Sequence, residues 1–437
     1  MKAIGILSFL TLASLGHAQT RYILRYTETE PLNTFLARYQ LTRVATVNAR
    51  PIHDISDPLN RNPAELLARI AGDTDGDVAM ELDQKVNLPI RSFSTPQTGA
   101  LSALTAAFQR TQPIAFFGTM APLGAIDQVP VRMVKSDLSW RSQGIGSGLV
   151  AVIDTGVDPN HPFLAPAVAP GFDFITNGGI GSELTGLPGD ILATINPTTT
   201  PLLGMQRTQL SNGHTPYFEP EVINAPNFSQ IPRGLGHGTM VAGAIRMAAP
   251  GVRILPIRAF SQSGAGRLFN VIRGLHAAED RGAKIANLSL NTATYSPELE
   301  RSVEELSARG MIIVASAGNN GRLNGPSYPA QLAKVTGVAS VGHNGRRSAF
   351  SNAGPSVAFV AAPGEALMLP FPGNRWAGGW GTSFAAPLVS GLAAKIVQRN
   401  PNATYNELQS ALGRSTPTSD PNLGLGILNI FDSVAGL

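Results

Sequence analysis

The stretch Gly148-Leu-Val-Ala-Val-Ile-Asp154-Thr-Gly156 decides the fold. Its apolar run is short and rich in β-branched residues, which is typical of a strand buried on both faces of a parallel sheet. Asp154 follows directly, so its carboxylate is expected at the carboxyl end of that strand. Sites of open α/β sheets gather at this edge. The stretch therefore predicts an α/β protein with a functional carboxylate at the edge of its sheet.

Two other glycine-flanked segments contain a histidine and a serine that could act together with this carboxylate. They are Gly236-His-Gly-Thr239 and Gly381-Thr-Ser-Phe-Ala-Ala-Pro387, and each opens an apolar helical pattern. A serine hydroxyl is a weak nucleophile until an imidazole takes its proton, and the imidazole needs a carboxylate to fix its tautomer. We therefore expect Ser383 to be a nucleophile, His237 its general base and Asp154 the residue that orients the base.

These three segments, in this chain order, resemble the subtilisin-like serine proteases, the subtilases. A fourth segment, Val314-Ala-Ser-Ala-Gly-Asn-Asn320, resembles the Ala-Gly-Asn segment of the family. The resemblance implies that Asn319 donates its side-chain amide to the oxyanion of the tetrahedral intermediate, a role worth about 3 kcal/mol. It covers the chain from about Gln128 to Leu437. It implies a three-layer α/β fold, in which a parallel sheet lies between helices on both faces.

The resemblance also implies which residues contact a substrate. The family's strand that pairs with the substrate backbone would be Ser289, Leu290 and Asn291, although Asn291 stands where glycine is usual. A first side-chain pocket would be lined by Ser316, Ala317, Gly318 and Ser327, and a second by Leu268, Val271 and Leu290, unless these last three only pack in the core. An uncharged pocket with small walls should accept medium to large apolar side chains without strong discrimination.

Composition excludes several other classes of protein. The 437 residues, 43% of them hydrophobic, exceed one typical domain and can bury a sizeable core. There is no cysteine, so disulfides cannot contribute to stability. The 33 Lys and Arg residues are spread along the chain, with no basic block of the kind that binds nucleic acid. We expect a monomer that acts on proteins or peptides and has no nucleic-acid partner.

The first residues have the pattern of a secretory signal peptide. Met1-Lys2 is followed by an apolar stretch from Ala3 to Leu15 and by the small-residue end Gly16-His-Ala18. Residues 1–18 are therefore predicted to direct export, to an extracellular or periplasmic location. The apolar run is too short for a membrane span, so no membrane association is expected after the signal is cleaved.

Residues 19–87 are predicted to form a separate small α+β domain. Strands are expected at Tyr22–Tyr26, 41–47 and Val78–Leu82, with helices at 31–39 and 63–71. This arrangement resembles the inhibitory propeptide that many subtilases carry, which would make this domain an intramolecular inhibitor. A permanent substrate-binding or adaptor domain is the alternative, because the sequence does not show whether the domain is removed.

Residues 88–127 contain four prolines and one helical patch at Leu101–Phe108, and are predicted to be a linker that holds the maturation site. The peptidase domain would then occupy residues 128–437. Within it, residues 177–232 are rich in Gly, Pro, Thr and Asn, and we expect them to form a surface loop.

The sequence predicts no cofactor for the chemistry and leaves a structural calcium ion possible but unassigned. Phe163 occupies the position where many subtilases place an acidic ligand of their strong calcium site, whereas Gln128 remains as a possible ligand. Calcium needs six to eight oxygen ligands, and the sequence does not supply a recognisable set. His161, His214 and His343 lack partners at metal-binding spacing, so we expect them to be exposed to solvent.

The main hypothesis is a secreted serine endopeptidase that folds with its propeptide, matures, and cleaves proteins through an acyl-enzyme on Ser383. Its rival is a catalytically silent binding protein with the same fold, which loss of a triad residue would favour. An esterase with the same triad is a third possibility, but Ser383 is not in the Gly-x-Ser-x-Gly segment typical of that class.

Overall fold

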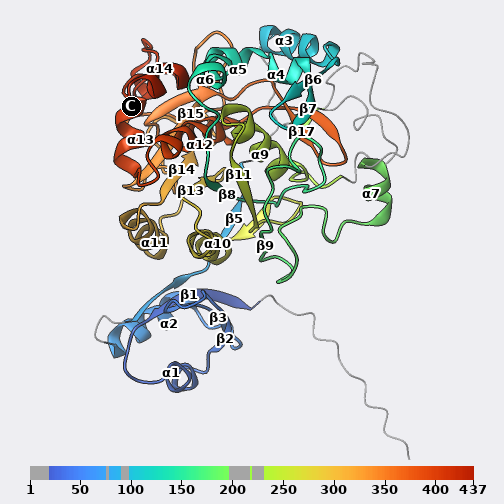
Figure 1. The fold of residues 1–437 in the computed structure, drawn as a ribbon. Helices are drawn as coiled ribbons and strands as arrows, with labels where there is room; N and C mark the ends of the chain where they lie inside the picture. Colours follow the sequence, from blue (N-terminus) through green and yellow to red (C-terminus); the bar gives the residue numbers. More distant parts are fainter. Residues whose placement is uncertain (1–18, 75–77, 90–97, 196–216, 219–230) are drawn as a thin grey trace, which may run out of the picture. The chain divides into compact units, whose positions relative to one another are not determined.

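The computed structural model describes residues 19–74, 78–89, 98–195, 217–218 and 231–437. The chain divides into two compact units, Met1–Asp83 and Gln84–Leu437, which are described separately here (Figure 1). The border lies four residues before the predicted border at residue 87. The predicted signal peptide, residues 1–18, lies outside the described residues.

The first unit is a four-stranded antiparallel sheet with two helices. Its strand order is β2-β3-β1-β4. The elements are β1 (Thr20–Tyr26), α1 (Leu32–Arg38), β2 (Thr42–Thr46), β3 (Ile52–Asp57), α2 (Pro63–Asp73) and β4 (Val78–Leu82). Side chains from the sheet and both helices form one apolar core, which includes Tyr22, Phe35, Tyr39 and Ile70. The three strands and two helices predicted from the sequence are confirmed.

The sequence did not predict β3, which lies between β1 and β2 in the sheet. Four of its six residues are polar, so it has neither an apolar run nor regular alternation. All six are nevertheless buried, because their polar groups are paired. Asp54 forms a salt bridge with Arg21 on β1, and Asp57 accepts hydrogen bonds from the side chain and backbone of Arg61.

The second unit is built on a seven-stranded parallel sheet, as predicted from the stretch at Asp154. The strand order is β16-β15-β14-β13-β8-β11-β9. The strands are β8 (Leu149–Asp154), β9 (Phe172–Asp173), β11 (Arg253–Arg258), β13 (Ile285–Leu288), β14 (Ile312–Ser316), β15 (Val335–Val341) and β16 (Val360–Pro363). β8 is central and pairs in parallel with β11 and β13. Asp154 therefore ends a strand in the middle of the sheet.

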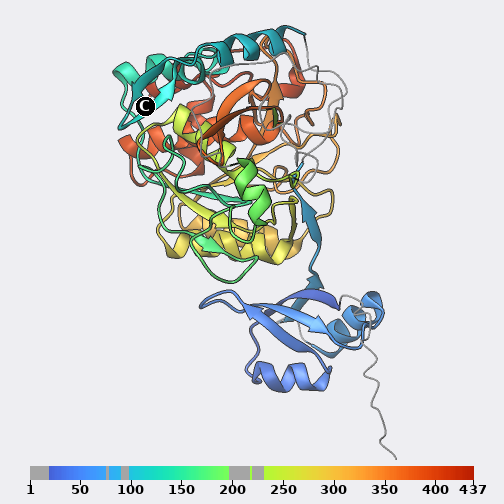
Figure 2. The same cartoon turned by 90° about the vertical axis from the view of Figure 1, so that its right-hand side faces the viewer.

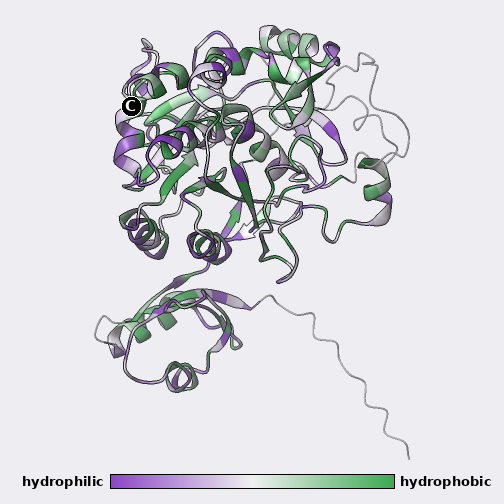
Figure 3. Ribbon diagram, in the orientation of Figure 1, coloured by the Kyte–Doolittle hydropathy of each residue, from purple (hydrophilic) through white to green (hydrophobic). Residues whose placement is uncertain are grey.

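Helices cover both faces of this sheet, which confirms the predicted three-layer α/β fold. Helices α9 (His237–Ala248) and α12 (Thr382–Arg399) pack together on one face, and α10 (Leu268–Asp280) and α11 (Pro297–Ala308) lie on the other (Figure 1). The strands are mainly apolar and the outer helices carry more hydrophilic residues (Figure 3). The second unit also contains the short helices α5 (Val129–Met133), α6 (Ser136–Ser142), α13 (Tyr405–Leu412) and α14 (Ile430–Ala435) and the 3₁₀ helix η2 (Pro421–Leu423).

Smaller antiparallel sheets border the main sheet. β17 (Leu367–Phe371), β18 (Arg375–Gly379) and β10 (Tyr217–Phe218) form one of them. β5 (Lys85–Asn87) pairs with β12 (Ala265–Arg267), and β6 (Pro113–Phe116) pairs with β7 (Thr119–Pro122). The pairing of β5 with β12 attaches the first residues of the second unit to the edge that holds the active site.

Residues 98–127 are not the loose linker that the sequence predicted. They form α3 (Thr98–Gln109), which contains the predicted helical patch, the hairpin β6–β7 and α4 (Leu123–Ile126), and they pack against the rest of the second unit (Figures 1 and 2). Leu104 and Phe116 are buried in the main core. The four prolines suggested a linker, but two of them start and end the hairpin instead of interrupting a helix.

The predicted surface loop at 177–232 is partly folded. It contains α7 (Gly189–Ile195), which buries Ile191 and Ile195 in the main core. Glu183, just before this helix, is also completely buried. Within this stretch, residues 196–216 and 219–230 lie outside the described structure.

Candidate active site

Asp154 and His237 form a buried pair at the carboxyl edge of the sheet. His237 Nδ1 lies 2.7 Å from Oδ1 and 2.8 Å from Oδ2 of Asp154. The backbone amide of Thr155 also donates to Asp154 Oδ1, at 2.7 Å. The carboxylate thus accepts the Nδ1 proton of His237, which leaves Nε2 unprotonated and able to accept a proton.

Ser383 stands in the first turn of α12, next to this pair. The ring of the following residue, Phe384, lies 5.6 Å from the imidazole of His237, measured between centroids. The Ser383 hydroxyl donates a 3.4 Å hydrogen bond to the backbone oxygen of Ser289. The Ser289 hydroxyl in turn donates to the backbone oxygen of Ser383, at 2.9 Å. The Phe384 ring thus places the first turn of α12, which holds Ser383, beside the pair of Asp154 and His237.

Asn319 follows β14 and presents its amide nitrogen to a peptide carbonyl. Its Oδ1 accepts hydrogen bonds from the backbone amide of Thr382 at 2.9 Å and from the Thr382 hydroxyl at 2.7 Å. With the oxygen held in this way, Nδ2 donates to the carbonyl oxygen of Pro89 at 2.7 Å. An oxyanion donor requires this arrangement: an amide fixed beside the nucleophile and directed at a carbonyl oxygen.

Residues 84–89, called the strap here, lie along this edge as an extended peptide. The strap pairs antiparallel with β12, in a register that places Asn87 opposite Ala265 and Lys85 opposite Arg267. Two backbone hydrogen bonds extend the ladder, from Leu88 N to Gly264 O and from Leu268 N to Gln84 O, both 2.9 Å. The strap therefore binds as an added strand and ends with its last described carbonyl on Asn319.

Glu183 is a site residue that the sequence analysis missed. Its Oε2 accepts from Gly236 N at 2.9 Å and from the Thr155 hydroxyl at 3.1 Å, and its Oε1 contacts the Thr239 hydroxyl. Complete burial raises the pKa of this carboxyl to about 8, and the nearby charge of Asp158 acts in the same direction. Glu183 thus connects the residue after Asp154 to the residues on either side of His237. Its position inside a Gly- and Pro-rich stretch gave no signal of this role.

The residues predicted to line the two substrate pockets are all buried. Ser316, Ala317 and Ser327 are completely buried, and so are Leu268, Val271 and Leu290. Ser289–Asn291 follow directly after β13, and Ser289 contacts Ser383 as described above. The hydrogen-bonded ladder of the strap runs along β12, which was not among the residues predicted to contact a substrate.

The residues that the sequence offered for calcium do not fit a calcium ion. Gln128 Oε1 accepts from Met368 N at 2.8 Å, and its Nε2 donates to the carbonyl oxygens of Ala125 and Met368. Its oxygen is therefore already engaged within the protein. Beside the buried Phe163 ring lies a guanidinium, because Arg246 donates to the carbonyl oxygens of Phe163 and Phe117. The carbonyl oxygens of Phe163 and Phe117 therefore already have a cationic donor.

The described residues contain no group of three or more His, Cys, Asp or Glu side chains that could hold a metal ion. His161 was expected to be exposed but is buried. Its Nδ1 accepts from Phe163 N, so Nε2 is the donor to the carbonyl oxygen of Arg375 at 2.8 Å. Burial lowers the pKa of His161 to about 4, which keeps it neutral. His343 is partly buried, and His214 lies outside the described residues.

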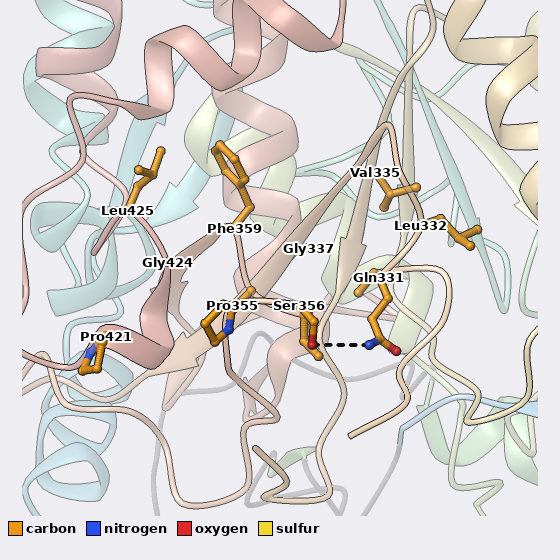
Figure 4. A pocket seen from close by; sticks show the side chains of 13 residues that line it. Gln331, Leu332, Val335, Gly337, Pro355, Ser356, Phe359, Pro421, Gly424 and Leu425 are labelled. Carbon is orange, nitrogen blue, oxygen red and sulfur yellow. Dashed lines mark hydrogen bonds between the residues drawn. The ribbon is translucent and has the colours of Figure 1, made fainter. Parts of the chain in front are cut away.

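A second hollow, of about 310 Å³, lies away from the triad, near the amino ends of β15 and β16 (Figure 4). Its thirteen lining residues include Gln331, Ser356 and Leu425, and none of them is charged. Gln331 and Ser356 hydrogen-bond to each other at 3.4 Å. The lining contains no acidic or basic side chain that could activate the Ser356 hydroxyl.

Taken together, the site can perform acyl transfer. The second unit holds a serine, an oriented imidazole and an amide donor that binds the carbonyl of a peptide held by backbone hydrogen bonds. No helix in the described part of the chain is long and apolar enough to cross a membrane.

Comparison with known proteins gives the same picture. The model of the subtilase family matches residues 146–430. Thermitase of Thermoactinomyces vulgaris is 33% identical over 260 residues, which are 59% of this chain and 78% of thermitase. Subtilisin Savinase of Lederbergia lenta is 34% identical over 209 residues, covering 46% of this chain and 75% of that protein. M-protease of Shouchella clausii is also 34% identical over 209 residues, but the match spans only 53% of its length.

A solved structure shows the same fold. The crystal structure of a lanthipeptide protease superposes with a TM-score of 0.54 and 20% identity, covering 72% of this chain and 96% of that chain.

Proposed function

The chain belongs to the subtilase family, and from this membership and the site geometry we propose that it is a secreted serine endopeptidase that is made as a self-inhibited precursor. Ser383 Oγ attacks a peptide carbonyl while His237 takes the hydroxyl proton. Asp154 orients His237 and stabilises the imidazolium that forms, and Asn319 binds the oxyanion. His237 then gives the proton to the leaving amine, and water hydrolyses the acyl-enzyme to regenerate Ser383.

The observation that supports this proposal best is the hydrogen bond from Asn319 Nδ2 to Pro89 O. It belongs to a peptide paired with β12, so the site accommodates an extended chain and not only a small acyl group. A silent binding protein has no need for an amide aligned on a carbonyl next to a serine and an oriented histidine. An esterase has no need for a strand that pairs with peptide backbone.

The same hydrogen bond identifies the bond that we propose is cut during maturation. Because Asn319 donates to the carbonyl of Pro89, the bond in reach of Ser383 is Pro89–Ile90. Cleavage there would free residues 19–89 as a propeptide whose last residues, the strap, still occupy the substrate edge. Residues 98–127 would stay with the mature enzyme, because they are packed into its core. The amino-terminal residues 1–18 would direct export.

Intact mass measurement over time tests this proposal. Refolded chain 19–437 is compared with Ser383→Ala, and casein hydrolysis is assayed on the same samples. We expect the wild type to release a fragment that ends at Pro89 and then to hydrolyse casein, while the variant does neither. If both chains stay whole and inactive, the chain is not a self-maturing peptidase. If casein is cleaved without release of the fragment, the first unit is a permanent domain.

A further inference from the structure

Asn291 fills space beside the first substrate pocket that the family's usual glycine would leave open. Gly318, on the predicted wall of this pocket, has φ +98°, and a Cβ built on it would lie 2.5 Å from Asn291 Nδ2. The Asn291 side chain therefore lies directly on the face of Gly318. Asn352 lies on the same face, with its Nδ2 2.6 Å from that Cβ position. Two side-chain amides thus meet at Gly318, one of the four residues predicted to line this pocket.

The other walls of this pocket cannot move aside easily. The Ser327 hydroxyl donates to the carbonyl oxygen of Ala317 at 2.5 Å, and the Ser316 hydroxyl donates to that of Leu290 at 3.3 Å. Gly318 N donates to the Thr382 hydroxyl at 3.1 Å. Hydrogen bonds thus fix Ser316, Gly318 and Ser327 to neighbouring segments. The space available in the pocket therefore depends on the Asn291 side chain.

The strap shows which side chains the edge accommodates. Val86 and Leu88 are buried, whereas Lys85 and Asn87 are exposed, as expected of a strand with one face on the protein. Pro89, whose carbonyl is held by Asn319, directly precedes the proposed cut, so its side chain is the one that the first pocket would receive in this register. Its ring is compact and only partly buried. The chain thus places a small cyclic side chain where large apolar ones were expected.

We propose that Asn291 is a specificity-determining residue, which restricts the first pocket to proline and small side chains. This inference rests on the proposed peptidase function. It replaces the expectation that medium to large apolar residues are accepted. A phenyl or isobutyl group would have to displace the Asn291 amide from Gly318, whereas alanine or proline would not. The preferred substrates are then unfolded segments with apolar residues at the second and fourth positions before the cut, as in Val86-Asn-Leu-Pro89.

A substrate series based on the strap tests this inference. Mature wild type and Asn291→Gly are assayed on Val-Asn-Leu-X p-nitroanilides in which X is Pro, Ala, Leu or Phe. We expect the kcat/KM of wild type to be at least about tenfold higher for the better of Pro and Ala than for Phe. Asn291→Gly should raise the ratio of kcat/KM for Phe to kcat/KM for Ala by about tenfold or more. Asn402→Gly, the same change at an exposed turn, should leave the series unchanged.

The two proposals fail in different ways. Labelling of Ser383 by a fluorophosphonate and casein cleavage report the peptidase without regard to the first pocket. If both are present and wild type prefers Phe, or Asn291→Gly leaves the Phe-to-Ala ratio unchanged, the role of Asn291 is wrong and the peptidase stands. If wild type gives neither labelling nor cleavage, the proposed function fails and the role of Asn291 fails with it.

Discussion

The side-chain amide of Asn319 donates a 2.7 Å hydrogen bond to the carbonyl oxygen of Pro89. Both residues belong to the second unit, and they join a loop at the carboxyl end of β14 to the end of the strap. The bond is directional because Thr382 holds the other atom of the amide, Oδ1, through two hydrogen bonds. The site is therefore preorganised for a peptide carbonyl at a defined point of the chain.

Replacement of Asn319 by Ala should reduce turnover without preventing binding. The Nδ2 hydrogen bond strengthens as negative charge develops on the carbonyl oxygen, so its loss should lower kcat about 10² to 10³-fold. KM should stay within about threefold of wild type, because the strand pairing to β12 is untouched. Steady-state kinetics on a peptide anilide measure both. An equal loss for the neighbouring change Asn320→Ala would argue against a specific oxyanion role.

Thr382→Val tests how the Asn319 amide is held. The substitution keeps the approximate volume of the side chain but removes the 2.7 Å hydrogen bond to Asn319 Oδ1 and the acceptor of Gly318 N, while the bond from the Thr382 backbone amide to Asn319 remains. We expect kcat to fall about tenfold, the equivalent of about 1.4 kcal/mol, with little change in KM. Thr382→Ser, which retains the hydroxyl, should recover most of the rate. If Val and Ser behave alike, the hydroxyl does not orient Asn319.

The triad and the parallel sheet could be predicted from the sequence because their signals are local. The run before Asp154 is apolar over a full strand, and the glycines beside His237 and Ser383 mark sharp turns into helices. The conformation at Gly236 is one such case, with φ +87°, and a Cβ there would lie 2.1 Å from the Phe371 ring. Such a motif can be recognised in the sequence because one short segment contains both the functional residue and the turn that positions its side chain.

The parts that could not be predicted depend on distant partners. β3 is polar and is buried only because Arg21 and Arg61 pair with its aspartates. Residues 98–127 become structured through core contacts such as the stacking of Phe116 on Phe163, at 5.4 Å between centroids. Asn291 was flagged as a departure from the family, but its contact with Gly318 needed the fold.

Removal of calcium should leave the stability of the enzyme unchanged. The Arg246 guanidinium already binds the carbonyl oxygens of Phe117 and Phe163, and the Gln128 side chain is fully engaged. We expect the Tm of Ser383→Ala, used to prevent autolysis, to be the same in excess EDTA and in millimolar calcium. Arg246→Met in the same background should lower stability by about 1 to 3 kcal/mol, because the buried carbonyl oxygen of Phe163 loses its donor. A clear gain in Tm with calcium would contradict this account.

Glu183→Gln should stabilise the protein more as the pH rises. In the unfolded chain this carboxyl loses its proton near pH 4.5, whereas burial raises its pKa in the folded protein to about 8. Between these values the unfolded state binds fewer protons, so the free energy of unfolding of wild type falls as the pH increases. Glutamine cannot ionise, yet its oxygen can accept from Gly236 N and its amide can donate to the Thr239 hydroxyl. The variant should therefore lack this pH dependence.

The measurement is the Tm of Glu183→Gln and of its parent, both carrying Ser383→Ala, between pH 5 and pH 9. The Tm of Glu183→Gln minus that of its parent should grow across this range, by the equivalent of at least about 1.4 kcal/mol, which is one pKa unit. In the active background, Glu183→Gln should keep kcat/KM at pH 7 within about threefold of wild type. Glu183→Ala should lose tenfold or more, because nothing then connects the loop after Asp154 to the start of α9. A Tm difference that stays constant with pH would contradict this account, because it would show that the pKa of Glu183 is the same in the folded and unfolded protein.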